Sequence, residues 1–382
     1  MKNSVKYFIG CGVPVFVCNF RCKYCYLGQH PDTTSKGIVP FSKSPEYIAS
    51  FFSVDKIGGY CYFNMCSSGE TMMHPQLIEL VSRLTKQGHY VDIISNGTLS
   101  KKYDQLVESL DEDQRKHVLI KFSWHYLELK RLNLMDKFVD NINKVKNAGI
   151  SYSIEITPND DLVPYIDEIK VFSLKHFGAL PHITVARNEA TSEIEILSRY
   201  NRMEYNKIWS SFDSDMFDFK LSVFNKKRCE FCYAGLWSLQ FNLRTGDFHQ
   251  CYGGDFLGNI KEGKIHFSAI GKCRQPHCFN AHAYLTYGVI PDLDTPTYCQ
   301  MRDRVTNEGK HWIQSETREF FNTRLKDSND ILLDEQKNRI VKMADIRHAV
   351  RIGKEKMTHA TLKLREKDKS GKQRKNAKSL FE

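Results

Sequence analysis

Short apolar runs alternate with longer amphipathic stretches through the first half of the chain. The short runs are rich in β-branched and aromatic residues and end at polar or glycine-containing segments, so they predict strands. They span residues 5–10, 60–65, 90–95, 117–123, 150–156 and 182–186. The amphipathic stretches place apolar residues on one helical face and predict helices. They span residues 45–53, 75–87, 101–110, 133–147 and 162–176.

One strand and its following helix occupy about thirty residues, which is the size of a βαβ unit. Strands buried on both faces and joined by right-handed crossovers form a parallel sheet. Six such units predict an α/β fold, an open six-stranded barrel. A further helix is expected over residues 193–211. Parallel α/β folds place their sites at the carboxyl ends of the strands, so we expect the chemistry there.

The second half of the chain has a different character. Residues 228–299 are dotted with cysteine and show little periodicity, which predicts a small domain organised by a metal. From about residue 304 the chain becomes helical and highly charged, and the basic stretch 365–379 predicts a frayed tail. We therefore expect three parts: a barrel over 1–225, a cysteine-rich domain over 226–303 and a helical, basic region over 304–382.

Composition excludes several classes of protein. The 382 residues are 41% hydrophobic and 12% aromatic, which is enough for a core and excludes a disordered chain. No apolar run reaches the roughly 18 residues of a spanning helix, so no membrane span is expected. The first twenty residues carry Pro14 and no small-residue cleavage site, so they do not predict a signal peptide. We expect a cytoplasmic, reducing compartment, where the 12 cysteines are metal ligands or catalytic thiols.

The sequence CNFRCKYC, directly after the first predicted strand, contains Cys18, Cys22 and Cys25. At spacings of four and three, these thiols can wrap one corner of a metal cluster from a single loop. A four-iron cluster normally takes four cysteines, so three leave one iron open for a cofactor or substrate. The alternatives are a helical stripe of buried cysteines and a zinc site completed by His30.

This CxxxCxxC loop after the first strand of a β/α chain resembles the signature of radical S-adenosylmethionine (SAM) enzymes. The resemblance covers about residues 5–190 and implies a partial (β/α)6 TIM-type barrel. It also implies a [4Fe–4S] cluster whose open iron binds SAM, and a reductant such as flavodoxin or ferredoxin. Reductive cleavage of SAM then gives a 5′-deoxyadenosyl radical that abstracts hydrogen from a substrate carbon. The cofactor supplies this chemistry and the protein positions it.

The resemblance extends to the ends of the later strands. Gly69 and Glu70 stand where the family has a Gly-Gly-Glu-like turn that holds the amino group of SAM, although Ser68 replaces the first glycine. The turn at Ser95 and Asn96 resembles a family turn and is also an ordinary strand-to-helix turn. The other residues that the resemblance assigns to SAM are Tyr24, Ser123, Glu155 and Arg187.

Two of these assignments have alternatives. An acid between apolar neighbours on a buried strand is costly unless it is paired, so Glu155 contacts SAM or forms an internal salt bridge. Arg187 follows the sixth strand and binds the SAM carboxylate or an anionic substrate, or is an exposed structural residue. The basic excess of the chain, which has a formal net charge of +10, would suit an anionic substrate, although charge runs are usually solvated faces.

A second group of cysteines resembles the start of the twitch/SPASM extension of radical enzymes, over residues 228–280. The group comprises Cys229, Cys232, Cys251, Cys273 and Cys278. A hairpin formed by 238–243 and 247–250 would bring distant thiols together. Zinc takes the same thiolates, but the first loop favours iron–sulfur. The count predicts one auxiliary [4Fe–4S] cluster, with Cys232 and Cys251 as the first choices, because a second cluster would need Cys299.

The remaining cysteines include two candidate catalytic thiols. A free cysteine is often a small buried hydrophobe, which is the expectation for Cys61. In epimerases of this superfamily a thiol returns a hydrogen atom to the substrate radical. Cys11 and Cys66 lie near the predicted cofactor, and either residue is a candidate for that role.

The resemblance predicts oxidation, dehydrogenation or epimerisation of a carbohydrate or other small polar substrate. Peptide-modifying relatives often carry a leader-binding domain before the cluster loop, and the loop here starts at Cys18. A short peptide or protein side chain is therefore the second expectation. The alternative from another class is a zinc-containing nucleic-acid-binding protein, which would bind in a strongly salt-dependent manner. We expect nucleic acid to be an unlikely partner.

Overall fold

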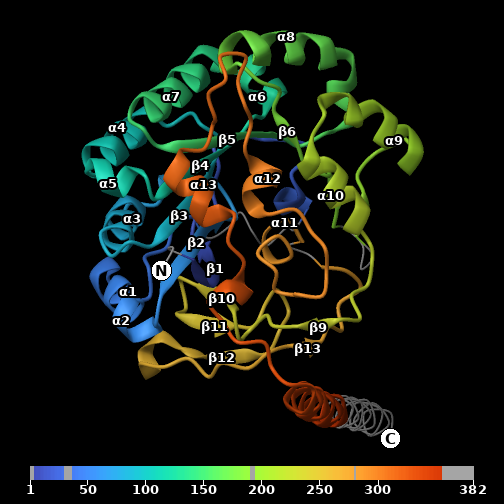
Figure 1. Ribbon diagram of the computed structural model, residues 1–382. Helices are drawn as coiled ribbons and strands as arrows, with labels where there is room; N and C mark the ends of the chain where they lie inside the picture. The colour runs from blue at the N-terminus through green and yellow to red at the C-terminus, as the bar shows by residue number, and fades with distance from the viewer. Residues whose placement is uncertain (1–3, 30–36, 190–193, 279–280, 355–382) are drawn as a thin grey trace, which may run out of the picture. The chain divides into compact units, whose positions relative to one another are not determined.

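The computed structural model describes residues 4–29, 37–189, 194–278 and 281–354 (Figure 1). The alternative zinc ligand His30 and the predicted tail at 365–379 lie outside these residues. Chain contacts divide the molecule into two compact units, residues 1–331 and 332–382. In the second unit, residues 334–354 form a helix. The first unit carries every predicted site residue.

A parallel sheet of six strands forms the centre of the first unit. In chain order the strands are β1 (Val5–Val13), β2 (Tyr60–Ser67), β3 (Tyr90–Ser95), β4 (Val118–Ser123), β5 (Ser151–Ile156) and β6 (His182–Ile183). Each strand is paired in parallel with the next, in the order expected for a partial barrel. The α/β fold with a parallel sheet typical of a partial TIM-type barrel is confirmed.

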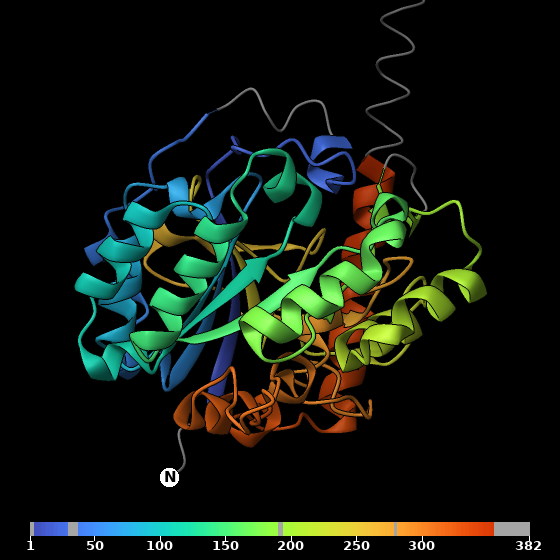
Figure 2. The same cartoon turned by 90° about the horizontal axis from the view of Figure 1, so that it is seen from above.

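Helices run between these strands and cover one face of the sheet, as the cyan and green ribbons show in Figure 2. The longer ones are α1 (Pro45–Phe51), α3 (Leu77–Thr85), α4 (Ser100–Glu108), α7 (Met135–Asn147) and α8 (Ile166–Phe177). Short turns accompany them as α2 (Val54–Ile57), α5 (Glu112–Arg115) and α6 (Tyr126–Arg131). Local sequence sets their ends: Ser44 accepts a hydrogen bond from the Tyr47 N–H, and Gly178 ends α8 at a φ of 73°.

The two faces of the sheet differ in chemistry. The face toward the helices is apolar and contributes Ile9, Phe63, Ile93 and Ile120 to the core. The opposite face, here called the lumen face, carries polar and charged residues in register with one another. These are Asn64, Cys66, Asp92, Lys121, Ser123, Ser153 and Glu155. A polar inner face of this kind suits the binding of a polar ligand.

The predicted hairpin is present and continues the same sheet. Its strands are β10 (Ser238–Asn242) and β11 (Asp247–His249), and β12 (Phe256–Asn259) follows. β10 pairs in parallel with β1, and β11 and β12 add antiparallel strands. The sheet therefore has nine strands, and the hairpin lies at the β1 edge.

The last elements of the first unit close one end of the lumen face. The helices that follow the barrel are α9 (Arg202–Trp209), α10 (Asp215–Val223), α11 (Ala281–Tyr284), α12 (Tyr298–Arg302) and α13 (Ser315–Phe321). Two small two-stranded sheets accompany them. One pairs β7 (Arg187–Asn188) with β8 (Glu195–Ile196), and the other pairs β9 (Phe231–Cys232) with β13 (Gly271–Lys272). Tyr298 stacks 5.0 Å from Tyr287, and both rings contact Tyr62 of β2. Aromatic packing thus joins the C-terminal segment to the sheet.

Two helix predictions were too long. Within the described residues, the helix expected over 193–211 starts only at α9 and continues into a 3-10 turn, Ser210–Phe212, because Asn201 caps the start of α9 and accepts from the N–H groups of Met203 and Glu204. The helix expected over 162–176 begins as a 3-10 turn, Asp160–Tyr165, which contains Pro164, before α8. Among the described residues, we find no helix with the length and apolar character needed to cross a membrane.

Candidate iron–sulfur and cofactor site

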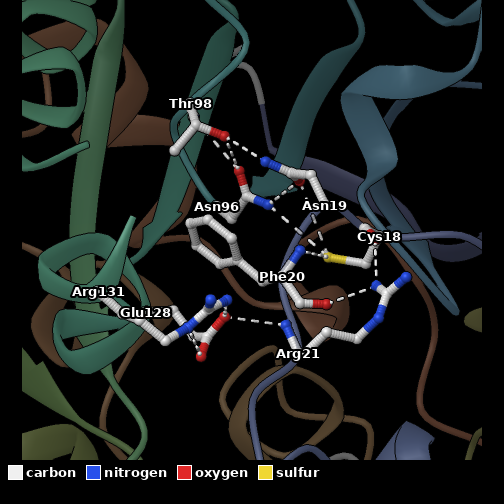
Figure 3. Close-up of polar contacts among 8 residues, drawn as sticks. All are labelled: Cys18, Asn19, Phe20, Arg21, Asn96, Thr98, Glu128 and Arg131. Carbon is white, nitrogen blue, oxygen red and sulfur yellow. Dashed lines mark hydrogen bonds and ion pairs between the residues drawn. The ribbon is translucent and has the colours of Figure 1, made fainter. Parts of the chain in front are cut away.

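The three-cysteine loop is held by backbone and charged contacts. The Phe20 N–H points at the Cys18 sulfur at 3.4 Å. The Arg21 guanidinium donates to the Cys18 carbonyl at 2.6 Å, and the Arg21 N–H donates to Glu128 at 3.0 Å. Glu128 belongs to α6 and forms an ion pair of 2.8 Å with Arg131. Helix α6 therefore anchors the loop that follows β1 (Figure 3).

Side chains after β3 hold the same loop from the other side. The amide of Asn96 donates to the Asn19 side-chain oxygen at 2.7 Å and lies 3.8 Å from the Cys18 sulfur. Thr98 accepts from Asn19 at 2.9 Å and donates to Asn96 at 2.7 Å. Figure 3 shows the closed ring of contacts that these three residues form. Hydrogen bonds to ligand sulfurs and their neighbours orient metal ligands, so Asn96 is positioned to support Cys18.

The thiols of this loop act on one another electrostatically. Burial, together with smaller effects from the charges of Glu128, Cys25 and Cys18, raises the pKa of Cys22 to about 12. Burial also raises the pKa of Cys18, where the Phe20 N–H and Asn96 partly offset the rise. Thiols that destabilise one another as anions are the donor set that a cationic iron site stabilises. The residues present therefore fit a three-cysteine cluster.

Gly69 and Glu70 are packed directly against the loop. The Glu70 N–H donates to the Val17 carbonyl at 3.0 Å. A side chain on residue 69 would lie 2.1 Å from that same carbonyl oxygen, so only glycine fits. The Gly-Glu turn and the cysteine loop thus form one backbone unit.

The Glu70 carboxylate is buried and already holds the β3 turn. It accepts from the Ser95 hydroxyl and the Asn96 N–H, both at 2.7 Å, and from the Met72 N–H at 3.0 Å. Burial raises the pKa of Glu70, and these hydrogen bonds oppose the rise. Glu70, Ser95 and Asn96 are therefore brought together beside Cys18, with a fixed carboxylate at their centre.

Tyr24 lies beside the loop as expected. Its hydroxyl is 2.8 Å from His125 Nδ1, and burial raises its pKa well above the ordinary value. Ser123 ends β4 on the lumen face, and Glu155 of β5 is its register partner. Arg187 starts β7, with its guanidinium 4.3 Å from the Tyr26 ring centroid and 3.1 Å from Glu189. These residues surround the carboxyl ends of the strands.

Glu155 has an internal partner. The buried guanidinium of Arg302, on α12, forms an ion pair with the Glu155 carboxylate. Of the two expectations for Glu155, the structure therefore shows the internal salt bridge. Deeper in the lumen, Lys121 lies 2.6 Å from Asp92, and both side chains are buried.

The second cysteine group converges on four thiols. Burial raises the pKa of Cys251 well above its ordinary value, and the charges of Cys278, Cys232 and Cys273 add to the rise. Cys232 is raised by burial and by the same neighbours, Cys278 and Cys273. Cys229 is exposed and is not among the charges that act on these two thiols. Cys232, Cys251, Cys273 and Cys278 are therefore the four thiols of this group whose charges act on one another.

The other cysteines separate by position. Cys66 lies on the lumen face, where burial raises its pKa and the nearby Lys121 and Arg187 partly offset the rise. Cys11 and Cys61 are buried in the apolar core on the helix side of the sheet, so the structure does not bring Cys11 to the site. Cys299 lies buried in α12, near Asp303 and Arg318 rather than the second group.

No set of three Cys, His, Asp or Glu side chains in the described ranges is arranged to hold a metal ion as it stands. Sequence reasoning also missed several residues that shape the site, namely Asn19, Thr98, His125, Glu128 and Lys220. Asn19 could have been predicted from the sequence, because its side-chain amide lies between two candidate ligand cysteines and can donate a hydrogen bond near them. The other four residues could not have been predicted, since their contacts depend on strand ends and helices far along the chain.

Comparisons with known proteins add the following findings. Residues 13–160 match the family model described as the Radical SAM superfamily. No curated protein matches the chain. Streptococcus suis SuiB is 13% identical over 69% of this chain and 66% of SuiB, with a TM-score of 0.46. This chain thus spans slightly less than two thirds of SuiB. anSMEcpe with bound AdoMet and Cp18Cys peptide is 14% identical over 89% of this chain and 99% of that chain, with a TM-score of 0.45.

The segment matched by the family model contains the three-cysteine loop, the Gly69–Glu70 turn and the β3 turn. Independently of that match, the structure packs these parts into one unit at the carboxyl ends of parallel strands. Residues 13–160 therefore form a Radical SAM superfamily segment of this chain.

Proposed function

We propose that Cys18, Cys22 and Cys25 hold a [4Fe–4S] cluster and that SAM binds at its open iron. Together these groups supply reductive cleavage of SAM and abstraction of a hydrogen atom from a substrate carbon. Asn96 and Arg21 hold the loop in place, and the Gly69–Glu70 turn beside the loop is the proposed contact for the SAM amino group. A flavodoxin or ferredoxin is the proposed reductant.

A single observation supports this proposal above the others. The cysteine loop, the Gly69–Glu70 backbone and the β3 turn are joined by hydrogen bonds of 2.7–3.0 Å. If the cysteine loop had no connection with the Gly69–Glu70 turn, residue 69 would not need to be glycine. In the structure a side chain at this position would clash with the Val17 carbonyl of the loop. The arrangement suits a cluster and a cofactor with an amino group that share one pocket.

The second part of the proposal is one auxiliary [4Fe–4S] cluster on Cys232, Cys251, Cys273 and Cys278. The mutual electrostatic effect of these four thiols supports it, and the exposed Cys229 is the one of five that is left over. We further propose that the Cys66 thiol, on the lumen face, is placed to return a hydrogen atom if the reaction is an epimerisation.

The substrate class is also a proposal. SuiB has been solved with its precursor peptide SuiA, and anSMEcpe has been solved with the Cp18Cys peptide. A peptide or protein side chain is the first substrate to assay here, and a carbohydrate or other small polar molecule is the second. This reverses the order that the sequence suggested.

The test of the proposed function is the Cys22→Ala variant. The anaerobically reconstituted wild type should contain about eight irons and form 5′-deoxyadenosine from SAM when dithionite is supplied. Cys22→Ala should lose about four irons and all of the 5′-deoxyadenosine, measured by iron analysis and liquid chromatography. Cys61→Ala, which removes a buried core thiol away from the loop, is the matched control and should keep both.

Two results would contradict the proposal. One is 5′-deoxyadenosine formation by Cys22→Ala at the wild-type rate, which would show that the loop is not the cluster site. The other is stoichiometric zinc in place of iron in the wild type, together with salt-dependent binding to nucleic acid. That result would favour the zinc-protein alternative.

A further inference from the structure

A pocket lies between the two cysteine groups, beyond the end of β6. Its volume is about 160 Å³. The residues that border it and matter here are Tyr24, Tyr26, Arg187, Lys220, His277 and Cys278. Tyr24 belongs to the first cysteine loop and Cys278 to the second group, so the pocket spans the space between them.

Lys220 is the unexplained residue in this pocket. It lies on α10, a helix that follows the barrel, and its ammonium group donates to the Thr184 hydroxyl. Lys220 has no carboxylate partner within the described part of the chain. The other two cations near it are paired: Arg187 lies 3.1 Å from Glu189, and Lys121 lies 2.6 Å from Asp92.

We propose that Lys220, together with Arg187, binds an anionic oxygen group of the substrate, a carboxylate or a phosphate, in this pocket. The inference rests on the proposed function for the fate of the bound molecule and adds the charge of the substrate to it. Lys220 is a binding residue here, because its contact is with the substrate.

The charge balance around Lys220 supports an anionic occupant. Burial, together with the positive charges of Arg187 and Lys121, lowers the pKa of Lys220 to about 7. A buried cation without a counterion is costly, and a carboxylate or phosphate beside it removes that cost. The Thr184 hydroxyl has no charge and cannot replace such a group.

The shape of the pocket supports the same conclusion. Arg187 is held in place by the Tyr26 ring and by Glu189, so its guanidinium is already ordered before a ligand arrives. The volume suits one small group, and the aromatic and aliphatic lining leaves the two cations to set the orientation. A substrate anchored here would extend between the first cysteine loop and Cys278.

The experiment measures anion binding directly, without turnover. The reconstituted protein is titrated by calorimetry with inorganic phosphate, with N-acetylglutamate as a carboxylate probe, and with glucose as a neutral control. The wild type should bind at least one anion and not glucose. Lys220→Met should weaken that binding by about tenfold or more, because it removes one charge-assisted contact. Lys220→Arg should restore most of it, and Lys207→Met, on the exposed face of α9, should bind as the wild type does.

The two anions separate the possible sources of the group. Preference for phosphate indicates a phosphorylated small molecule, and preference for N-acetylglutamate indicates a carboxylate of a peptide or amino acid. The proposal is overturned if the wild type binds neither anion, or if Lys220→Met binds both as tightly as the wild type. It is also overturned if Lys220→Met loses affinity for SAM but keeps its affinity for the anions.

The calorimetric measurement of anion binding can be judged separately from the proposed function. Absence of 5′-deoxyadenosine from the wild type would refute the radical chemistry and leave the calorimetric result standing. Loss of anion binding in Lys220→Met, with the nucleoside product still formed by the wild type, would support both.

Discussion

Gly69 shows how one backbone position determines the site. Its Cβ would meet the Val17 oxygen at 2.1 Å, whereas a Cβ at Gly12, on the neighbouring strand, would lie 3.8 Å from the Phe241 oxygen. The first distance is a severe clash with backbone, and the second is an ordinary contact. Both glycines lie near the cysteine loop, but only one of them needs to be glycine.

We expect Gly69→Ala to push the Gly-Glu turn away from the cysteine loop. The Glu70 N–H bond to Val17 would be lost, and Glu70 would move relative to Cys18. Iron content and 5′-deoxyadenosine formation should fall by about tenfold or more, since displaced supporting groups typically cost 10–100-fold. Gly12→Ala is the control. Equal iron content and equal activity in the two variants would contradict this account.

For individual residues, the sequence predicted which residue types form the site better than it predicted their interaction partners. The sequence favoured Cys232 but kept Cys229 among the candidate ligands, because burial separates the two thiols and spacing does not encode burial. Glu155 was recognised as a costly buried acid, but its partner Arg302 lies almost 150 residues later and outside any motif. Charge partners of this kind are fixed only by the fold.

Helix α1 and strand β2 are joined by a single buried imidazole. His89 accepts from the Cys61 N–H at 3.1 Å, so its other nitrogen donates to the Phe52 carbonyl at 2.7 Å. Both ring nitrogens are used by the neutral form, and a second proton would break the bond to Cys61. Burial lowers the pKa of His89 to about 4.

The two hydrogen bonds of His89 predict that the stability of the fold decreases at acidic pH. The folded pKa lies below the ordinary value of about 6.5, so the unfolded chain binds the proton more readily, and stability falls as pH decreases from about 6.5 toward 4. His89 alone should account for about 3 kcal/mol over that window. His182, with its pKa lowered to about 3, and His125, lowered to about 4, add to the effect.

The measurement is denaturant unfolding at pH 7.5 and pH 5 under anaerobic conditions. His89→Gln keeps one donor and one acceptor but cannot titrate, so its stability should fall less between the two pH values than that of the wild type. An unchanged pH dependence in His89→Gln would show that His89 is not involved.

Elements with strong patterns were predicted well. The five longer strands and α1, α3, α4 and α7 lie within a few residues of their expected positions, because apolar periodicity reports burial directly. The helix predicted over 193–211 began too early in the described residues, since a capping box at Asn201 sets the start of α9 and outweighs the weak pattern before it.

The whole unit is closed by a polar network at the base of the lumen. Asp92 receives hydrogen bonds from Asn64 at 2.6 Å and from Tyr298 of α12 at 3.0 Å, besides its ion pair with Lys121. These residues come from β2, β3, β4 and the C-terminal segment. The network therefore joins distant parts of the chain around one buried carboxylate.

Removing that carboxylate should destabilise the fold strongly. Asp92→Ala leaves Lys121 buried without a partner, and we expect a loss of about 3–5 kcal/mol in the free energy of unfolding. The control is Asp113→Ala, which breaks an ion pair of 2.7 Å whose acid is 91% exposed, so the free energy of unfolding should change far less. Similar losses for the two variants in thermal or denaturant unfolding would contradict the role of burial.

The sequence predicted the barrel but not how its C-terminal part attaches. The hairpin at 238–250 was expected from its turn residues, yet its parallel pairing with β1 joins residues some 230 positions apart. Edge strands are hydrogen-bonding templates without a sequence code for their partner, so only the folded chain reveals the pairing.

The β1–β10 pairing also has a consequence for biosynthesis. During translation, β1 emerges long before β10, and the edge of β1 that pairs with β10 stays unsatisfied until residues 238–242 have left the ribosome. An exposed strand edge on a partly made barrel is prone to aggregation. Nascent chains that stop before this point should therefore depend on chaperones, and amino-terminal fragments expressed alone should be poorly soluble.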